Sequence, residues 1–496
     1  MPVRLELGTT EQLEAGIAVS ALPQTFRDAI SVVQSLGQIY LWIDTLCIIQ
    51  DSAEDWEREG MQMDSIYDNA WCTLAASHAH DSTEGLFVAR DRRLLALCSY
   101  DLPPDLRTDK HSSSGRVYLV DARLWADNID DAPLYSRGWV VQERLLSPRT
   151  VHFGAEQVFW ECPELAACES FPAGLPYPPS SHRVVRPTPD FNAFKRLLSP
   201  FPGLEAAKPP PFLTPNGWGK MVAGYVKRLV SPMLDVGDGA PPESFAYETW
   251  CKIVASYTEC NLSQEKDKLV AISGVAKRLQ PYLDDVPCAG LWRKSLSHGL
   301  TWTSDEGGQL YRPKAYRAPS WSWASVEGPV QFMLGVDWHP RIDVVCCDAP
   351  TKDGSGFGEV KYGHLTLRGH LQPVRWGNGS EMLSSASGRQ ERKSVWIPEI
   401  GDTPFPYWDI NWDARHRHDD MDEPLRNSMF IAPLGWAENV NPSQEDRAIG
   451  LLLRKQTQSP SEHWYERVGV LNVRRKKDHR DLYTLFRADP CLFEVR

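Results

Sequence analysis

The chain has 496 residues, of which 42% are hydrophobic and 24% charged, and its formal net charge at pH 7 is −12. This length allows two domains that each bury a core, and the acidic balance argues against a nucleic-acid partner. No apolar run is long enough to span a membrane, and the first residues lack a signal-peptide pattern, so we expect no membrane partner.

The amino-terminal elements alternate between helix and strand. Apolar residues at three- and four-residue spacing predict a helix over Leu22–Leu36. Residues 39–43 (IYLWI) are apolar without alternation, as in a strand covered on both faces. Ser52 and Asp55 have the spacing of a capping box before a second helix, and residues 70–76 predict the next strand. Together these elements predict a βαβ unit in a parallel sheet.

The next part of the chain begins with a polar, irregular insertion. This insertion covers residues 88–135 and contains a short predicted strand at Val117–Val120. A helix is then predicted over Gly138–Leu146, and two short apolar segments, Val151–Phe153 and Val158–Trp160, predict a hairpin.

Prolines crowd together over residues 171–217, which predicts a linker or a long surface loop. Helical periodicity returns at Phe245–Tyr257 and Lys266–Leu279. The rest of the chain predicts short strands in antiparallel β-structure. Three of these strands are expected at Leu365–Leu371, Ala448–Leu453 and Val468–Val473.

Tryptophan and cysteine usage adds two expectations. The chain has 19 tryptophans, and clusters such as Trp321-Ser322-Trp323 predict buried cores. The 11 cysteines include no CxxC pair, and adjacent Cys346 and Cys347 would not form an ordinary structural disulfide with each other. This pattern predicts reduced thiols and a cytoplasmic location.

Several blocks of sequence resemble a known family. Residues 22–30 (LPQTFRDAI), 40–51 (YLWIDTLCIIQD) and 137–147 (RGWVVQERLLS) are similar to the signature blocks of fungal heterokaryon incompatibility (HET) domains, in the right order. Residues 289–292 (AGLW) and 318–324 (APSWSWA) resemble the tail of many HET-domain proteins. The opening pattern YxxLSYxWG has no counterpart before Glu6, so we expect the domain to lack its first strand.

HET domains in turn resemble TIR domains, and this implies a fold class. We expect an α/β TIR-like amino-terminal domain with a flavodoxin-like parallel sheet and flanking helices, followed by an α+β region with mainly antiparallel strands. The expected boundaries are a HET domain over residues 1–165, a proline-rich linker or loop over 166–218, a helical region with the family's tail motifs over 219–330, and a mostly β region over 331–496.

The resemblance also implies a role in non-self recognition and regulated cell death. The expected partner is a second copy of the chain or another incompatibility protein. The sequence implies no resident cofactor, and NAD enters as a possible substrate because some TIR domains cleave it.

Glu143 is the candidate catalytic residue. It closes a WxxxE pattern with Trp139, and NAD-cleaving TIR enzymes carry their catalytic glutamate in such a pattern. On a helix, Trp139, Glu143 and Leu146 share one face, and partial burial among apolar neighbours raises a carboxyl pKa. The alternative is an ion pair with Arg137, Arg144 or Arg149 that only positions the helix. Both interpretations stay open at this point.

Five further residues are candidates for substrate binding. Asp44 is expected at the carboxyl end of a central strand, where open α/β sheets bind ligands, although it can equally accept N–H groups of its own turn. The other candidates can line the same cleft or fix loops. They are Gln50, Arg137, Trp139 and Gln142.

Cys47 and a histidine pair are weaker candidates. Cys47 has no activating base nearby in sequence and is expected to be a buried thiol. His78 and His80 would lie on one face of a strand, but no further ligands with zinc-like spacing accompany them, so no metal site is predicted.

Three functions are therefore weighed. The first is signalling by self-association of the TIR-like domain, the second is NAD hydrolysis by Glu143, and the third is a degenerate scaffold. A missing first strand would deprive Glu143 of half a pocket and expose a sheet edge, so self-association ranks first.

Overall fold

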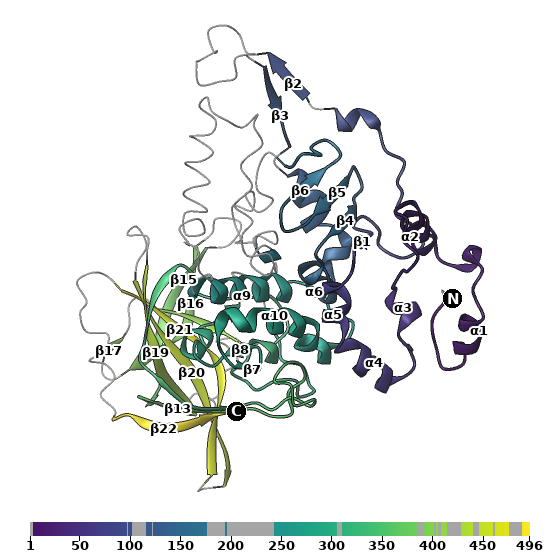
Figure 1. Cartoon of the computed structure of the whole chain (residues 1–496). Coiled ribbons are helices and arrows are strands. Elements are labelled where there is room, and N and C mark those ends of the chain that lie inside the picture. Colours follow the sequence, from purple (N-terminus) through teal and green to yellow (C-terminus); the bar gives the residue numbers. More distant parts are fainter. Residues whose placement is uncertain are drawn as a thin grey trace. The chain divides into compact units, whose positions relative to one another are not determined.

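The computed structural model describes residues 3–96, 98–101, 116–121, 123–175, 194–195, 243–304, 310–384, 390–400, 403–404, 408–413, 428–439, 446–459, 462–475 and 489–496 (Figure 1). The chain divides into two compact units, each described by itself below. Unit 1 comprises Met1–Thr249, Cys260–Leu262 and Val270–Tyr282, and unit 2 comprises Trp250–Glu259, Ser263–Leu269 and Leu283–Arg496.

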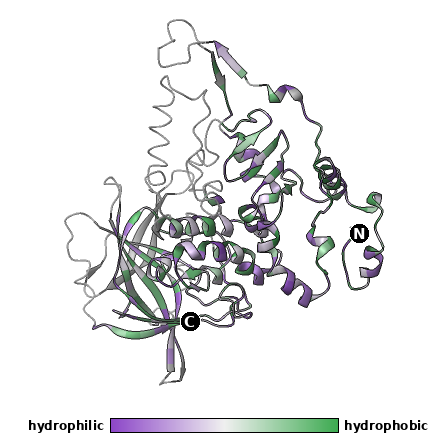
Figure 2. Cartoon of the chain, viewed as in Figure 1, coloured by the Kyte–Doolittle hydropathy of each residue, from purple (hydrophilic) through white to green (hydrophobic). Residues whose placement is uncertain are grey.

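Unit 1 begins with short helices whose ends follow the sequence signals. Pro23 precedes α2, and Gly37 lies just beyond it with a left-handed φ of 69°, which only glycine adopts without strain. The Ser52 hydroxyl accepts the Asp55 N–H at 3.2 Å and caps α4, as predicted. Figure 2 shows that α4 is largely hydrophilic. The helices are α1 (Thr10–Glu14), η1 (Val19–Ala21), α2 (Gln24–Ser35), α3 (Asp44–Cys47), α4 (Ala53–Gly60) and α5 (Met63–Asp68).

The strand predicted over residues 39–43 is not formed. This segment is extended but pairs with no described strand, and Asp44 begins α3 instead of ending a strand. Ile39 is 82% exposed and Tyr40 is 87% exposed, whereas a covered strand would bury both. The apolar run predicted burial correctly only toward its end, where Leu41 packs against the cluster around Phe153.

The sheet of unit 1 is mixed, not parallel throughout. Its strand order is β1-β4-β5-β6, and only β1 and β4 are parallel. A tight turn, in which the Gly154 N–H bonds the Gln157 carbonyl at 3.0 Å, joins β4 to β5 and makes them antiparallel neighbours. The predicted hairpin is thus confirmed, and the predicted βαβ unit with a first strand at 39–43 is wrong. The strands are β1 (Thr73–Ala75), β4 (Thr150–Phe153), β5 (Val158–Glu161) and β6 (Ala166–Cys168).

The predicted insertion and helix lie between β1 and β4. Helix α6 covers Gly138–Leu146, as predicted, and β3 confirms the short strand near Val117. From residue 176 on, the predicted proline-rich segment lies outside the described residues, except for Phe194 and Lys195, whose side chains are buried. The remaining elements are η2 (Arg92–Leu95), β2 (Cys98–Asp101), β3 (Arg116–Leu119), the π-helical turn η4 (Ala126–Asp130) and η5 (Pro133–Ser136).

The later helices agree with the predicted periodicity. Helix α9 covers the predicted segment Phe245–Tyr257, and the segment predicted over Lys266–Leu279 is divided into two 3₁₀ turns and α10. The elements are α9 (Glu243–Thr258), η8 (Glu265–Lys268), η9 (Val270–Ile272), α10 (Ser273–Leu283), β7 (Pro287–Cys288), β8 (Leu291–Trp292), α11 (Leu296–Gly299), β9 (Thr303–Ser304), η10 (Trp323–Ser325) and β10 (Val330–Gln331).

Unit 2 ends in a large, mainly antiparallel sheet, which confirms the predicted class of this region. Its order is β11-β19-β20-β21-β22-β13-β12, with β14 on β19 and β18 on β21. Met429, Ile431 and Leu452 lie in a cluster of buried side chains along it. Its strands are β11 (Val336–Pro340), β12 (Asp343–Asp348), β13 (His364–Gly369), β14 (Gln372–Pro373), β18 (Trp408–Trp412), β19 (Met429–Asn439), β20 (Asp446–Ser459), β21 (Glu462–Arg475) and β22 (Cys491–Val495). A separate three-stranded sheet consists of β15 (Arg375–Ser384), β16 (Gln390–Ile400) and β17 (Thr403–Pro404).

Tryptophans form much of the interior of unit 2, as their clustering predicts. Trp321 and Trp323 are fully buried, and the Trp302 Nε1 donates to the Trp321 carbonyl at 2.9 Å. The predicted state of the cysteines is corrected, because Cys288 and Cys347 are joined by a disulfide.

Candidate functional site

Helix α6 holds Glu143 on a well-anchored element of unit 1. The Gly138 N–H donates to the Asn261 carbonyl at 2.8 Å, and the Asn261 N–H donates back to Ser136 at 2.7 Å. At the other end of the helix Leu145 and Leu146 are buried. A side chain held by such an element keeps a defined direction, as a reactive group requires.

The environment of Glu143 brings together three of the predicted site residues. Its half-buried side chain is hydrogen-bonded to Tyr67, and Asp44 and Arg137 lie close enough to influence its charge. Burial raises the pKa of Glu143 to about 7, and the negative charge of Asp44 adds to this rise. The hydrogen bond from Tyr67 and the positive charge of Arg137 act in the opposite direction. A carboxyl that titrates near neutrality is suited to acid–base work.

Tyr67 is a site residue that sequence reasoning missed. Burial raises its pKa well above the usual value, and the neighbouring charge of Glu143 raises it further. The phenol therefore stays neutral, and its hydroxyl donates a hydrogen bond to the Glu143 carboxylate. Nothing in the sequence connects Tyr67 on α5 with Glu143 on α6, since only the packing of the two helices joins them.

Aromatic rings pack around this group. The ring of Trp42 meets Tyr67 edge-on at 5.8 Å, and Trp56 meets Trp139 edge-on at the same distance. Trp139, a predicted substrate-binding residue, thus packs against Trp56, and both side chains are half-buried. Such edge-to-face pairs add stability beyond the area they bury and hold the rings in place.

Asp44 and Gln50 fix the loop at α3. The Asp44 Oδ1 accepts the Thr45 N–H at 2.7 Å and its hydroxyl at 3.0 Å. The Gln50 Nε2 donates to the Ile48 carbonyl at 3.0 Å. These bonds match the turn-forming alternative for both residues, and the expected place of Asp44 at a strand end is wrong because that strand is not formed.

Gln142, Arg144 and Arg149 each bond to a residue other than Glu143. The buried Gln142 Oε1 accepts the Gly274 N–H at 2.7 Å, so this side chain ties α6 to α10. Arg144 pairs with Glu161, and the Arg149 Nη1 donates to the Trp71 carbonyl at 3.2 Å. Of the three arginines predicted as ion-pair partners, Arg137 is the one that lies beside Glu143.

A second group of ionisable side chains, missed in the sequence, is buried behind α6. We call it the Glu161 cluster. The Arg144 Nε lies 2.9 Å from the Glu161 Oε2, and the Lys195 Nζ lies 3.5 Å from the same oxygen. The His152 Nε2 lies 3.3 Å from it, and the Tyr135 hydroxyl lies 2.5 Å from the His152 Nδ1. Its members are Asp130, Tyr135, Arg144, His152, Glu161 and Lys195.

The charges in the Glu161 cluster balance one another. Arg144 and then Lys195 lower the pKa of Glu161 well below its ordinary value, and they outweigh the effect of burial. Burial lowers the pKa of His152 to about 4, so this imidazole is neutral at pH 7. The predicted hairpin contained a signal for this cluster, because alternation along β4 and β5 directs His152 and Glu161 to the same inner face.

The remaining candidates lie outside these groups. Cys47 is exposed as a residue, contrary to the prediction. Partial burial of its thiol raises the pKa of that thiol, and the negative charge of Asp44 adds to the rise. A raised pKa leaves less thiolate and so disfavours a role as a nucleophile. His78 bonds to the Phe153 carbonyl and His80 lies beside Glu84, and no strand holds them on one face. Among the described residues no three His, Cys, Asp or Glu side chains gather as metal ligands would.

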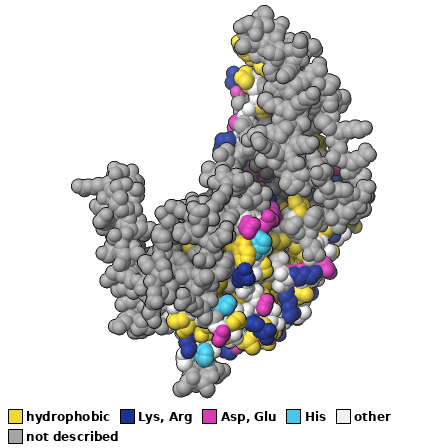
Figure 3. Space-filling model, turned by 90° about the vertical axis from the view of Figure 1, so that its left-hand side faces the viewer, with side chains coloured by type: hydrophobic (Ala, Val, Ile, Leu, Met, Phe, Trp, Pro, Cys, Tyr) yellow, Lys and Arg dark blue, Asp and Glu magenta, His cyan; other side chains and the backbone are white. Residues whose placement is uncertain are grey.

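The described surface mixes its charges. On the described part of the face in Figure 3, acidic, basic and apolar side chains are interspersed. Within the described parts of the chain, none of the helices has the length and apolar character needed to cross a membrane.

Comparison with known proteins identifies the amino-terminal part of the chain. No curated protein and no solved structure matches the chain. Residues 4–143 match the family model described as Heterokaryon incompatibility protein (HET), a segment that ends on Glu143 itself. The chain therefore carries a heterokaryon incompatibility (HET) domain over residues 4–143.

Proposed function

We propose that this chain acts in heterokaryon incompatibility-type signalling, and that its HET domain does so by associating with a second copy of itself. The HET domain supports the first part of this proposal. The apolar segment of residues 39–43, which pairs with no described strand, supports the second part.

The segment of residues 39–43 has the properties of a strand without a partner. Ile43 has β-region backbone angles, with φ −135° and ψ 121°. Ile39 and Tyr40 expose large apolar side chains, and Leu36 beside them is 43% exposed. A second copy can cover these side chains and pair with the backbone of this segment ahead of Ile43, whose own carbonyl is bonded within α3. Unprotected strand edges associate in this way.

The net charge of −12 opposes this association at low ionic strength. Self-association is therefore expected to strengthen as salt screens the repulsion.

Replacing Ile39 and Tyr40 together by Asp is expected to abolish self-association, because two charges would have to be buried in the contact. Sedimentation velocity over a range of protein concentrations measures this directly. The matched control is Leu119→Asp, at a residue of unit 1 that is 63% exposed, and it should associate like the wild type. A wild-type chain that stays monomeric at high concentration contradicts the proposal.

NAD hydrolysis is a second candidate function, which the environment of Glu143 favours. In this reaction the bond between nicotinamide and C1′ of the ribose breaks, and nicotinamide leaves with the electron pair. The ionised Glu143 carboxylate would stabilise the positive charge that develops on the ribose. Tyr67 would hold the carboxylate in place. Water then adds to C1′ and one proton is released.

If Glu143 catalyses this reaction, Glu143→Gln should stop NAD loss, since the amide keeps the shape of the side chain but not its charge. The wild-type rate should fall as the pH drops below about 7, where Glu143 becomes protonated. Chromatography of NAD and nicotinamide after incubation measures both effects. Glu156→Gln, at an exposed glutamate, is the control, and NAD loss that persists in Glu143→Gln rejects the assignment.

The same variant has a readout that does not depend on catalysis. The pKa of Glu143 is raised on folding, so its ionised form destabilises the folded state, and stability is lost as the pH rises through about 7. Glu143→Gln should therefore be more stable than the wild type at pH 8. Such a gain in stability at the expense of activity is typical of a residue kept for function.

A further inference from the structure

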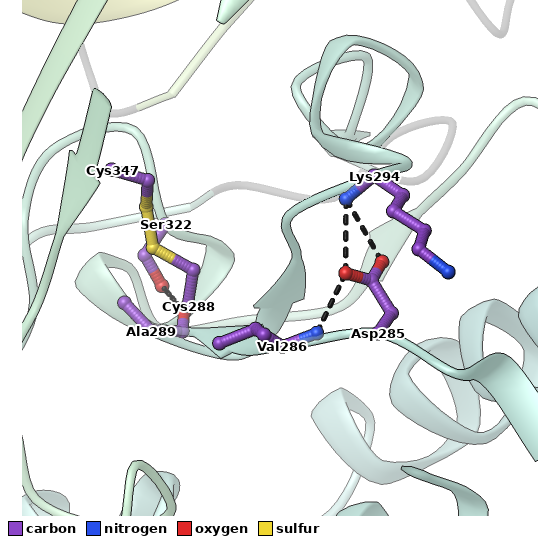
Figure 4. Close-up of a disulfide and its surroundings, with 7 residues drawn as sticks. All are labelled: Asp285, Val286, Cys288, Ala289, Lys294, Ser322 and Cys347. Atoms are coloured by element: carbon purple, nitrogen blue, oxygen red, sulfur yellow. Dashed lines mark hydrogen bonds between the residues drawn. A yellow bond between two sulfur atoms is a disulfide. The ribbon is translucent and has the colours of Figure 1, made fainter. Parts of the chain in front are cut away.

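The disulfide of unit 2 joins a short hairpin to the edge of a sheet (Figure 4). Cys288 ends β7, and Cys347 lies in β12, 59 residues later. The β7–β8 hairpin consists of two residue pairs, and β12 pairs with β13 alone among the described strands. A hairpin of two residue pairs is marginally stable by itself, so the disulfide helps to hold it against β12.

The hairpin turn is a junction for the two HET-like tail motifs. Ala289 and Gly290 form it with left-handed φ values of 49° and 82°. The Ala289 carbonyl accepts the Ser322 hydroxyl at 2.6 Å, and the Gly290 carbonyl accepts the Trp323 Nε1 at 2.7 Å. The turn next to Cys288 is therefore hydrogen-bonded to the residue 318–324 motif.

The other end of the hairpin is closed by a carboxylate. The Asp285 Oδ1 accepts the Val286 N–H at 2.6 Å, and the two Asp285 oxygens accept the Lys294 N–H at 3.0 and 2.9 Å (Figure 4). The Arg293 N–H in turn bonds the Val286 carbonyl at 3.0 Å. These amide groups report how firmly the hairpin is held.

The distribution of the other thiols indicates that the disulfide is reversible. Cys47, Cys98, Cys346 and Cys491 are exposed and unbonded. Chains that fold in oxidising compartments rarely expose so many thiols, because these would pair wrongly. In a reducing compartment a single disulfide is typically transient or regulatory.

We propose that Cys288 and Cys347 form a redox switch that sets the rigidity of the hairpin carrying the residue 289–292 motif. The half-buried Cys347 is the sulfur that a small thiol or disulfide can reach, whereas Cys288 is buried. In oxidation, the Cys347 thiolate attacks glutathione disulfide and releases one glutathione thiolate. The Cys288 thiolate then displaces the second glutathione. The two protons of the protein thiols pass to the two glutathiones, and reduction reverses these steps.

The test equilibrates the full chain in buffers of glutathione and glutathione disulfide, followed by alkylation and mass spectrometry. The linked peptide pair of Cys288 and Cys347 is expected to appear and disappear with the glutathione ratio, reaching the same ratio-dependent fraction from either direction. A link that survives excess dithiothreitol in the folded protein, or one that never forms, overturns the proposal.

Hydrogen exchange measures the structural consequence. On reduction, the amides of Val286, Arg293 and Lys294 should exchange at least about tenfold faster. Cys347→Ala should show the fast exchange at every glutathione ratio, and a thermal melt of this variant checks that unit 2 is still folded. Cys346→Ala, at the adjacent exposed thiol, should respond like the wild type. Equal exchange in the oxidised and reduced wild type would reject the switch.

Discussion

Replacing Arg144 by Met is expected to lower the free energy of unfolding of unit 1 by about 3–5 kcal/mol, the usual result of removing one partner from a buried ion pair. Arg144 is the central cation of the Glu161 cluster. Its Nε and Nη2 lie 2.9 and 3.1 Å from the two Glu161 oxygens, and its Nη1 lies 3.2 Å from the Asp130 Oδ1. Its guanidinium also lies 4.8 Å from the Tyr135 ring centre.

The loss is large because the remaining partners do not replace the guanidinium. Without the guanidinium, Glu161 keeps the ammonium group of Lys195 at 3.5 Å and the neutral imidazole of His152 at 3.3 Å. The buried Glu161 carboxylate is then incompletely hydrogen-bonded, and the free energy needed to remove it from water is no longer offset. Methionine fills much of the space, so the change tests charge and hydrogen bonding more than packing.

Urea denaturation, with hydrogen exchange of the α6 and β4 amides to follow unit 1, measures the change. The matched control is Arg123→Met, since Arg123 is 61% exposed and pairs with Asp127 and Asp131 at the surface. The control should leave the urea midpoint unchanged. An Arg144→Met variant as stable as the wild type would show that the cluster does not stabilise unit 1.

His152 is also expected to lower the stability of unit 1 by a few kcal/mol as the pH falls from about 6.5 to 4.5, so His152→Gln should gain about that much stability relative to the wild type over this range. The pKa of His152 is lowered to about 4 by burial, with Arg144 and Lys195 acting in the same direction. Neutral His152 can donate from Nε2 to Glu161 and accept the Tyr135 hydroxyl at Nδ1.

The sign of this effect follows from proton binding. An unfolded histidine has a pKa of about 6.5, so between pH 6.5 and about 4 the unfolded chain binds the proton that folded His152 refuses. Titration of His152 therefore lowers the free energy of unfolding as the pH falls through this window, whereas protonation of Glu143 raises it. The lowered pKa of Glu161 adds a further loss only at more acidic pH, where an unfolded glutamate becomes protonated.

Thermal melts of unit 1 at half-unit pH steps test the expectation. His80→Gln serves as the control, because the His80 side chain is 74% exposed. It should follow the pH dependence of the wild type. If the stability difference between His152→Gln and the wild type does not change with pH, the expectation for His152 is wrong.

The sequence was most informative where local pattern and burial agree. Gly138 and the apolar face after it defined α6, and the alternation around β4 and β5 defined the hairpin. The same local pattern failed at residues 39–43, because an apolar run predicts burial but cannot provide the partner that buries it.

The sequence could not predict which distant residues come together in the sites, and the reason is different. Glu143 was found through a motif, but Tyr67 shares no motif with it and meets it only through helix packing. Cys288 and Cys347 are 59 residues apart, and nothing in their spacing distinguishes them from the other cysteines. Residues that act together in these groups come from separate elements, which is information carried by tertiary structure.

The bond between Gln142 and Gly274 has a consequence for how the chain folds during synthesis. Gly274 follows Gln142 by 132 residues, so at ordinary translation rates α6 waits on the order of ten seconds for its partner helix. Throughout that interval the part of α6 around Gln142 and Leu146, which Gly274 covers in the folded chain, lacks this cover. Nascent chains of this protein are therefore expected to depend on holding factors until residues beyond Tyr282 have emerged.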